Sequence, residues 1–232
     1  MSGPALAMLL AAGRGTRMGA LTAARPKPLV EVGGQALIDH ALDRLAAAGV
    51  RRVVVNLHYL GGMIRAHLAG RASPEIVFSE EEALLETGGG MRLARPLLGR
   101  EPVFALNADA IWAGADPLAS LTGAWDGARM GALLHLARRE DALGHKGPGD
   151  FFRDGEGRLA RRGAAEAAPF VFTGAEIIDP GALDDTPEGP FSLNLVWDRL
   201  IAEGRLFGVV HEGRWADVGS PEGIGLAEGL LR

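Results

Sequence analysis

Short apolar segments alternate with longer amphipathic segments along the first half of the chain, and this alternation limits the fold more than any other feature. The runs VVVN at 53–56 and VFALN at 103–107 are apolar without a break, which is typical of strands covered on both faces. The segments between such runs have the spacing of amphipathic helices. Strands and helices in alternation, with brief connections, favour an α/β fold with a mostly parallel sheet flanked by helices.

The expected elements follow from this pattern and from turn and cap signals. In the first half, the pattern predicts strands at Ala5–Leu10, Arg52–Asn56, Glu75–Phe78 and Val103–Leu106, and helices at Ala36–Ala48, Gly62–Ala69 and Thr87–Ala94. In the second half, it predicts strands at Gly131–His135, Phe170–Ile178 and Leu206–Val210, a hairpin turn at Asp154–Gly155, a mobile loop at Arg161–Pro169, and helices at Ser192–Glu203 and Pro221–Leu231 with Ser192 and Ser220 as N-caps.

Composition excludes several classes of protein. Lys and Arg number 24 against 29 Asp and Glu, so the formal charge of −5 offers no general attraction for nucleic acid or an anionic membrane. The absence of cysteine excludes disulfides, thiolate metal sites and a cysteine nucleophile. No apolar run reaches the length of a membrane span, and the apolar N-terminus lacks the basic region of a signal peptide. We therefore expect a cytoplasmic enzyme that binds neither nucleic acid nor membrane.

A glycine-rich loop, LAAGRGTRM at 10–18, follows the first predicted strand. Its small residues allow backbone N–H groups to approach a phosphate chain, and Arg14 and Arg17 add charge-assisted contacts. The alternative is a plain glycine-rich turn. The spacing fits neither the Rossmann fingerprint nor a Walker A loop, which argues against a nicotinamide oxidoreductase.

Three charged side chains occupy positions suited to phosphate or metal. Lys27 lies between two prolines that stiffen its backbone, although a solvated loop lysine is the ordinary interpretation. Asp109 follows a buried strand, where open α/β sheets bind ligands, and is a candidate Mg²⁺ ligand; otherwise it caps the next helix. Asp217 ends a short apolar stretch and would supply a second carboxylate at the same edge of the sheet. Glycines at 88–90 indicate a base- or sugar-binding turn, or merely a helix start.

Taken in order, these motifs resemble the sugar-1-phosphate nucleotidyltransferases over essentially the whole chain. Within that family, the segments LETGGG at 85–90, GHKGPGDF at 144–151 and WADVG at 215–219 are most similar to the N-acetylmuramate-1-phosphate uridylyltransferases. Relatives that make nucleoside-diphospho-mannose or -glucose usually carry Gly where Glu86 stands. The family's Asn-Gly-Asp is Asn107-Ala108-Asp109 here, which places an extra methyl group beside the expected metal site.

The resemblance implies a three-layer, Rossmann-like fold with a mixed, mostly parallel sheet and helices on both faces. A single domain would span 1–232, with a nucleotide-binding half at about 1–110 and a sugar-binding half at about 111–232, as a monomer or small homo-oligomer. The implied reaction transfers a nucleotidyl group from a nucleoside triphosphate, with UTP favoured, to a sugar 1-phosphate. Mannose-1-phosphate guanylyltransferase or glucose-1-phosphate nucleotidyltransferase activity is the alternative, and a non-catalytic nucleotide-sugar sensor is a third interpretation.

The resemblance also assigns roles to residues. Lys27, Arg17 and Asp109 would be catalytic, and Asp109 with Asp217 would hold Mg²⁺. The nucleotide would contact Ala11, Ala12, Gly13, Arg14, Gly15, Thr16, Lys27, Glu81, Glu86 and Thr87, with Glu81 at the base unless it is part of a solvated acidic face. The sugar would contact Asn107, Asp150, Thr173, Gly174 and His145. His145 and Lys146 would pair with the sugar's negative groups unless their loop is merely solvated.

Overall fold

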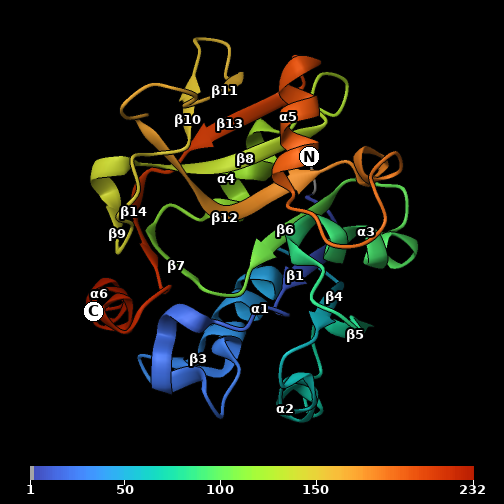
Figure 1. The fold of residues 1–232 in the computed structure, drawn as a ribbon, viewed down its shortest axis with the longest axis vertical. Coiled ribbons are helices and arrows are strands. Elements are labelled where there is room, and N and C mark those ends of the chain that lie inside the picture. The colour runs from blue at the N-terminus through green and yellow to red at the C-terminus, as the bar shows by residue number, and fades with distance from the viewer. Residues whose placement is uncertain (1–2) are drawn as a thin grey trace.

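The computed structural model describes residues 3–232, and its centre is a nine-stranded sheet (Figure 1). Seven strands run in the order β11-β10-β12-β6-β1-β4-β5, while β8 pairs with β12 and β13 pairs with β8. Their bounds are β1 Leu6–Leu10, β4 Arg52–Leu57, β5 Glu75–Glu80, β6 Val103–Asn107, β8 Ala132–Arg138, β10 Phe151–Arg153, β11 Leu159–Arg161, β12 Phe170–Ile178 and β13 Leu206–Val210.

The sheet is mixed, and the parallel strands of its first half are the ones that sequence periodicity predicted; β13 also pairs in parallel with β8. Strand β1 pairs in parallel with β4 and β6, and β4 with β5. Strand β12 then joins β6 antiparallel and carries the second half of the chain into the same sheet. The site can therefore draw side chains from both halves.

Helices cover both faces of the sheet, so the three-layer prediction is confirmed. Alternate residues of β1 face opposite ways: Ala7 and Leu9 belong to one core and Met8 to the other. The first core includes residues of α1 Leu37–Ala47, α2 Gly61–Leu68 and α4 Pro117–Ala124. The second includes residues of α3 Glu86–Leu98 and α5 Asn194–Ala202.

A small second sheet was not predicted from the sequence. It contains β7 Ala110–Gly114, β14 Gly213–Asp217 and β9 Ala142–Leu143, and α6 Pro221–Leu230 packs against it. A two-stranded ribbon, β2 Glu31–Val32 with β3 Gln35–Ala36, completes the strands of the described chain. Asp217 lies opposite Ala110 in the β14–β7 register. The expectation that Asp109 and Asp217 share one edge of one sheet is therefore wrong: antiparallel pairing in the small sheet brings Asp217 to the end of β6.

Two predicted caps differ in detail. The helix predicted from Ser192 begins at Asn194, and the Ser192 hydroxyl accepts from the N–H of Asn194 at 3.3 Å. Ser220 does occupy the N-cap position of α6, but its hydroxyl donates to Glu222 instead of capping a backbone N–H. Within residues 3–232, no helix combines the length and apolar character that crossing a membrane requires.

Candidate active site

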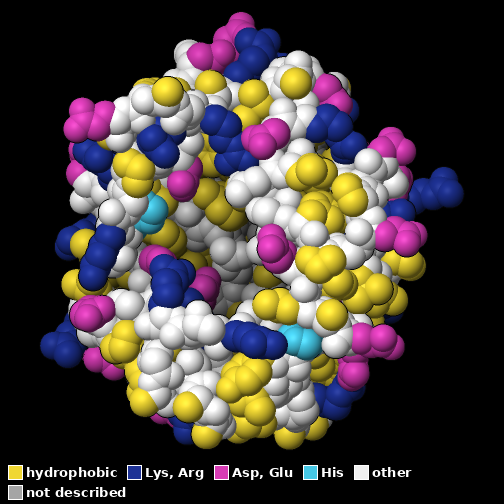
Figure 2. All heavy atoms as spheres, in the orientation of Figure 1, with side chains coloured by type: hydrophobic (Ala, Val, Ile, Leu, Met, Phe, Trp, Pro, Cys, Tyr) yellow, Lys and Arg dark blue, Asp and Glu magenta, His cyan; other side chains and the backbone are white. Residues whose placement is uncertain are grey.

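A hollow opens in one face of the molecule, with basic and acidic side chains around it (Figure 2). Its floor lies where β1 and β6 end side by side, with Leu10 opposite Asn107 in their parallel register. Open α/β sheets bind ligands beyond the carboxyl ends of such strands. Three adjoining pockets occupy this region, and all three include residues of the β1 or β6 ends.

The first pocket, of about 240 Å³, has the character of a phosphate site. Its walls include most of the predicted glycine-rich loop: Ala11, Gly13, Gly15, Thr16 and Arg17. Lys27, Asp109 and Gly219 face them. Ala12 lines the second pocket, described below, instead of this one. Arg14 is exposed and lines none of the three pockets.

Lys27 is held rigidly at this site. It is only 9% exposed, and its Nζ lies 2.5 Å from Asp109 Oδ2. A side chain on Gly15, where φ is +62°, would come within 2.8 Å of the Lys27 Cβ, so the loop needs glycine to pack against the lysine. The interpretation of Lys27 as a solvated loop residue is therefore wrong. So is the helix-cap alternative for Asp109, because Asp116 caps α4.

A second ion pair joins Arg17 to Asp217, with Nη1 and Oδ2 3.9 Å apart. Burial, and then the negative charge of Asp109, raise the pKa of Asp217 above its ordinary value. A side chain on Gly219 would approach both Asp217 Oδ2 and the Arg17 guanidinium to about 3 Å. Two carboxylates that repel each other in a partly buried pocket, with oxygen as the donor atom, fit the coordination chemistry of Mg²⁺.

The second pocket, of about 410 Å³, lies where the sequence motifs place the nucleoside, and we call it the nucleoside pocket. Glu86 and Thr87 line it, as predicted, together with Asn56, Leu84 and Ser192. Asn56 was not among the predicted residues. It is the last residue but one of β4, the strand next to β1 in the sheet, and that adjacency is the signal that would have found it.

Glu81 lies behind this pocket and does not line it. It is 5% exposed, so the solvated-face interpretation is wrong. Its Oε1 accepts from Asn56 Nδ2 at 2.7 Å, and its Oε2 accepts from the N–H of Leu85 at 3.0 Å. Asn56 Oδ1 in turn accepts from the N–H of Ala11 at 2.7 Å. Glu81 therefore acts on the pocket through Asn56, where direct contact with the base was expected.

The three glycines at 88–90 lie inside α3 and serve close packing. A Cβ on Gly89 would meet the carbonyl oxygen of Gly189 at 2.4 Å, and one on Gly90 would meet Glu81 Oε1 at 2.6 Å. Just before them, Glu86 has a left-handed backbone with φ of +61°. Glycine would adopt that conformation without strain, whereas a glutamate pays a steric cost for it.

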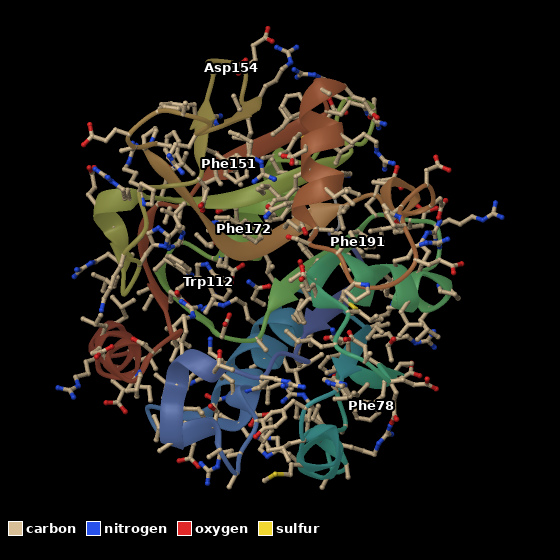
Figure 3. The ribbon with its side chains drawn as sticks, viewed as in Figure 1. Phe78, Trp112, Phe151, Asp154, Phe172 and Phe191 are labelled. Carbon is tan, nitrogen blue, oxygen red and sulfur yellow. The ribbon has the colours of Figure 1, made fainter. Side chains whose placement is uncertain are left out.

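The third pocket, of about 330 Å³, contains all five residues predicted for the sugar: Asn107, His145, Asp150, Thr173 and Gly174. The structure adds Arg161, Asn194, Trp197 and Trp215, which sequence reasoning missed. Phe172, also on its wall, projects from β12 (Figure 3).

Several of these side chains already have protein partners. Asp150 Oδ2 accepts from the N–H of Phe172 at 2.9 Å, and the Thr173 hydroxyl is bonded to the buried His135. His145 Nε2 has no hydrogen-bond partner among the described residues, and it is buried beside Gly147 of its own loop. Lys146 is exposed and outside the pocket, where its charge acts on Glu222. The expected pairing of Lys146 with the sugar is therefore not supported.

A glycine-rich loop, Lys27 and two carboxylates among three adjoining pockets at the ends of β1 and β6 are the arrangement expected of a nucleotidyl-transferring protein. The chain belongs to the MobA-like NTP transferase domain family, whose model matches residues 7–168. Its relatives are sugar-1-phosphate nucleotidyltransferases, as the sequence motifs predicted.

One relative, the N-acetylmuramate alpha-1-phosphate uridylyltransferase of Caulobacter vibrioides, is 48% identical over 98% of this chain and 97% of its own length. The enzyme of the same name from Neisseria meningitidis is 34% identical over 92% and 93%. Among solved structures, HddC from Yersinia pseudotuberculosis complexed with GMP-PN superposes with a TM-score of 0.79 at 20% identity, covering 98% of this chain and 99% of its own. That likeness shows the shared fold.

Proposed function

We propose that this protein transfers the uridylyl group of UTP to N-acetylmuramate 1-phosphate. The observation that carries the proposal is the convergence of Lys27, Asp109, Arg17 and Asp217 at the junction of the phosphate and third pockets. The relatives from Caulobacter vibrioides and Neisseria meningitidis support the choice of nucleotide and sugar.

In this reaction, a phosphate oxygen of the sugar 1-phosphate attacks the α-phosphorus of UTP. The new P–O bond forms as the bond from the α-phosphorus to the bridging oxygen breaks, and pyrophosphate leaves with that oxygen. Both reactants are anions, so catalysis depends on positioning and on stabilising negative charge. Lys27 supplies a fixed positive charge, and Arg17 with the loop amides holds the departing phosphates. Mg²⁺ held by Asp109 and Asp217 would neutralise further charge on the phosphates.

The third pocket supplies the acceptor site. His145 lines this pocket, and Arg161, which also pairs with Asp198 at 2.6 Å, brings a cation to its wall that suits an anionic group such as a lactyl carboxylate. Asp150 has one oxygen bonded to the backbone and leaves the other for a sugar hydroxyl. Asn107 lies between the sugar and nucleoside pockets and can hydrogen-bond either ligand.

The test is to assay pyrophosphate release with each of the four ribonucleoside triphosphates against N-acetylmuramate, glucose, mannose and N-acetylglucosamine 1-phosphates. We expect the highest kcat/KM with UTP and N-acetylmuramate 1-phosphate. A preference for GTP with mannose 1-phosphate would instead support the activity named for other relatives, which are about 28% identical. Tight nucleotide-sugar binding with no pyrophosphate from any pair would indicate a sensor.

A further inference from the structure

A smaller recess of about 200 Å³ opens beneath the site, and it contains a buried acid that the proposed chemistry does not use. This acid is Glu176 on β12, which is 1% exposed. Its Oε2 accepts from Trp197 Nε1 at 3.0 Å, and its Oε1 makes no hydrogen bond with the described residues. Buried polar groups are almost always hydrogen-bonded. We therefore expect a ligand group to bond the unpartnered oxygen of this acid in the cavity wall.

At Glu176 the recess borders the third pocket, where we expect the sugar (the sugar pocket), and not the nucleoside pocket. Its single bonded partner, Trp197, lines the sugar pocket, as does Phe172, whose ring meets Trp197 edge-on with centroids 4.8 Å apart. The opposite end of the recess, near Thr87 and Ser192, borders the nucleoside pocket, where Asn56 already provides a polar side chain.

We propose that Glu176 is a specificity-determining residue for the acceptor and hydrogen-bonds an uncharged N-acyl amide on the sugar. The inference rests on the proposed function and names the group that this recess selects. Leu10, Ala105, Phe172 and Leu193 form apolar walls suited to the acyl methyl, and the volume is larger than a hydroxyl needs.

The protonation of Glu176 supports this assignment. Burial raises the pKa of Glu176 to about 8, so the side chain is an uncharged acid at pH 7. Because Oε2 accepts from Trp197, the proton is left on Oε1, where it can donate to an amide carbonyl. Glutamine presents an N–H at the same place, whereas leucine has a similar size and no hydrogen-bonding group.

The experiment compares N-acetylmuramate 1-phosphate with its analogue that carries a hydroxyl in place of the acetamido group. The ratio of their kcat/KM values with UTP is measured for the wild type, Glu176→Gln and Glu176→Leu. We expect Glu176→Gln to keep the ratio within about threefold and Glu176→Leu to lower it about tenfold or more. Thr186→Val serves as the matched control and should leave the ratio unchanged, because it removes a buried hydroxyl that bonds to Leu183 and lines none of the four pockets.

A binding measurement keeps the inference testable apart from turnover. Saturation-transfer NMR should show strong transfer from the protein to the acetyl methyl protons of N-acetylmuramate 1-phosphate, and this transfer should weaken in Glu176→Leu. Equal losses for both acceptors would mean that Glu176 only supports the fold, and a changed nucleotide preference would place it at the nucleoside; either result overturns the inference. Absence of pyrophosphate with every acceptor would instead refute the proposed function, while the methyl signal would still decide the role of Glu176.

Discussion

Replacing Glu81 by glutamine should destabilise the protein and weaken nucleotide binding, although Glu81 does not reach the nucleoside pocket. Both carboxylate oxygens of Glu81 accept hydrogen bonds, one from Asn56 and one from the N–H of Leu85. Glutamine has only one acceptor, so its NH₂ must face one of these donors. Asn56 cannot rotate to relieve the conflict, because its own oxygen accepts from the N–H of Ala11.

The magnitude follows from one lost hydrogen bond to a buried charged group and one donor left without a partner. Such losses cost about 2–3 kcal/mol in the free energy of unfolding. For a chain of this length that corresponds to a fall in Tm of about 4–12 °C. The relay of hydrogen bonds from Glu81 through Asn56 holds the Ala11 amide in the glycine-rich loop. KM for UTP should therefore rise several-fold more than kcat falls. Urea unfolding and steady-state kinetics measure these effects.

Glu82→Gln is the matched control, since Glu82 is exposed and is the next residue along the chain. Its free energy of unfolding should stay within about 0.5 kcal/mol of the wild type. If Glu81→Gln and Glu82→Gln behaved alike, the buried relay would not hold the loop and the explanation would be refuted.

Asp109→Asn and Asp217→Asn should each lower kcat about a hundredfold while circular dichroism remains that of the wild type, because each removes a carboxylate from the proposed metal site; near-normal rates at low Mg²⁺ would contradict the assignment. Lys27→Ala should lower kcat strongly and also reduce the free energy of unfolding by about 1–3 kcal/mol, because Lys27 is buried against Asp109; wild-type kinetics would exclude it from the phosphate site. The pKa of Glu176 rises from 4.5 to about 8 on folding, so the folded state keeps a proton that the unfolded state releases as pH rises between these values. As pH rises through that window, the wild type should therefore lose about 1.4 kcal/mol of unfolding free energy per pH unit relative to Glu176→Gln. Urea unfolding of both proteins at pH 5, 6.5 and 8 tests this, and a difference between wild type and variant that stayed constant with pH would refute it.

The sequence predicted the parallel strands of the first half because they are short apolar runs that alternate with amphipathic helices. It predicted the glycine-rich loop and Asp109 because residues after such strands meet at one edge of the sheet. It predicted Lys27 because the prolines on both sides stiffen its backbone. The small sheet was missed because β7 and β14, which are as long as β1 and β6, join segments about a hundred residues apart. Asp217 was identified only from its motif, and its geometry depends on that pairing.

Side-chain partners were the second limit of sequence reasoning. Nothing in a run of three glutamates tells which one is buried, and only the close approach of α3 to Asn56 shows that it is Glu81. Glu176 was likewise hidden in a strand whose pattern predicted only burial. Its chemistry depends on Trp197, which comes from a helix in another layer.

The account's central claim is tested most directly by mixing the purified protein with UTP, N-acetylmuramate 1-phosphate and Mg²⁺ and measuring the products by phosphorus NMR. We predict pyrophosphate and the uridine-diphospho-sugar in equal amounts, with the rate of formation of both about a hundredfold lower in Asp109→Asn. No pyrophosphate under these conditions, or equal rates with and without the sugar 1-phosphate, would contradict it.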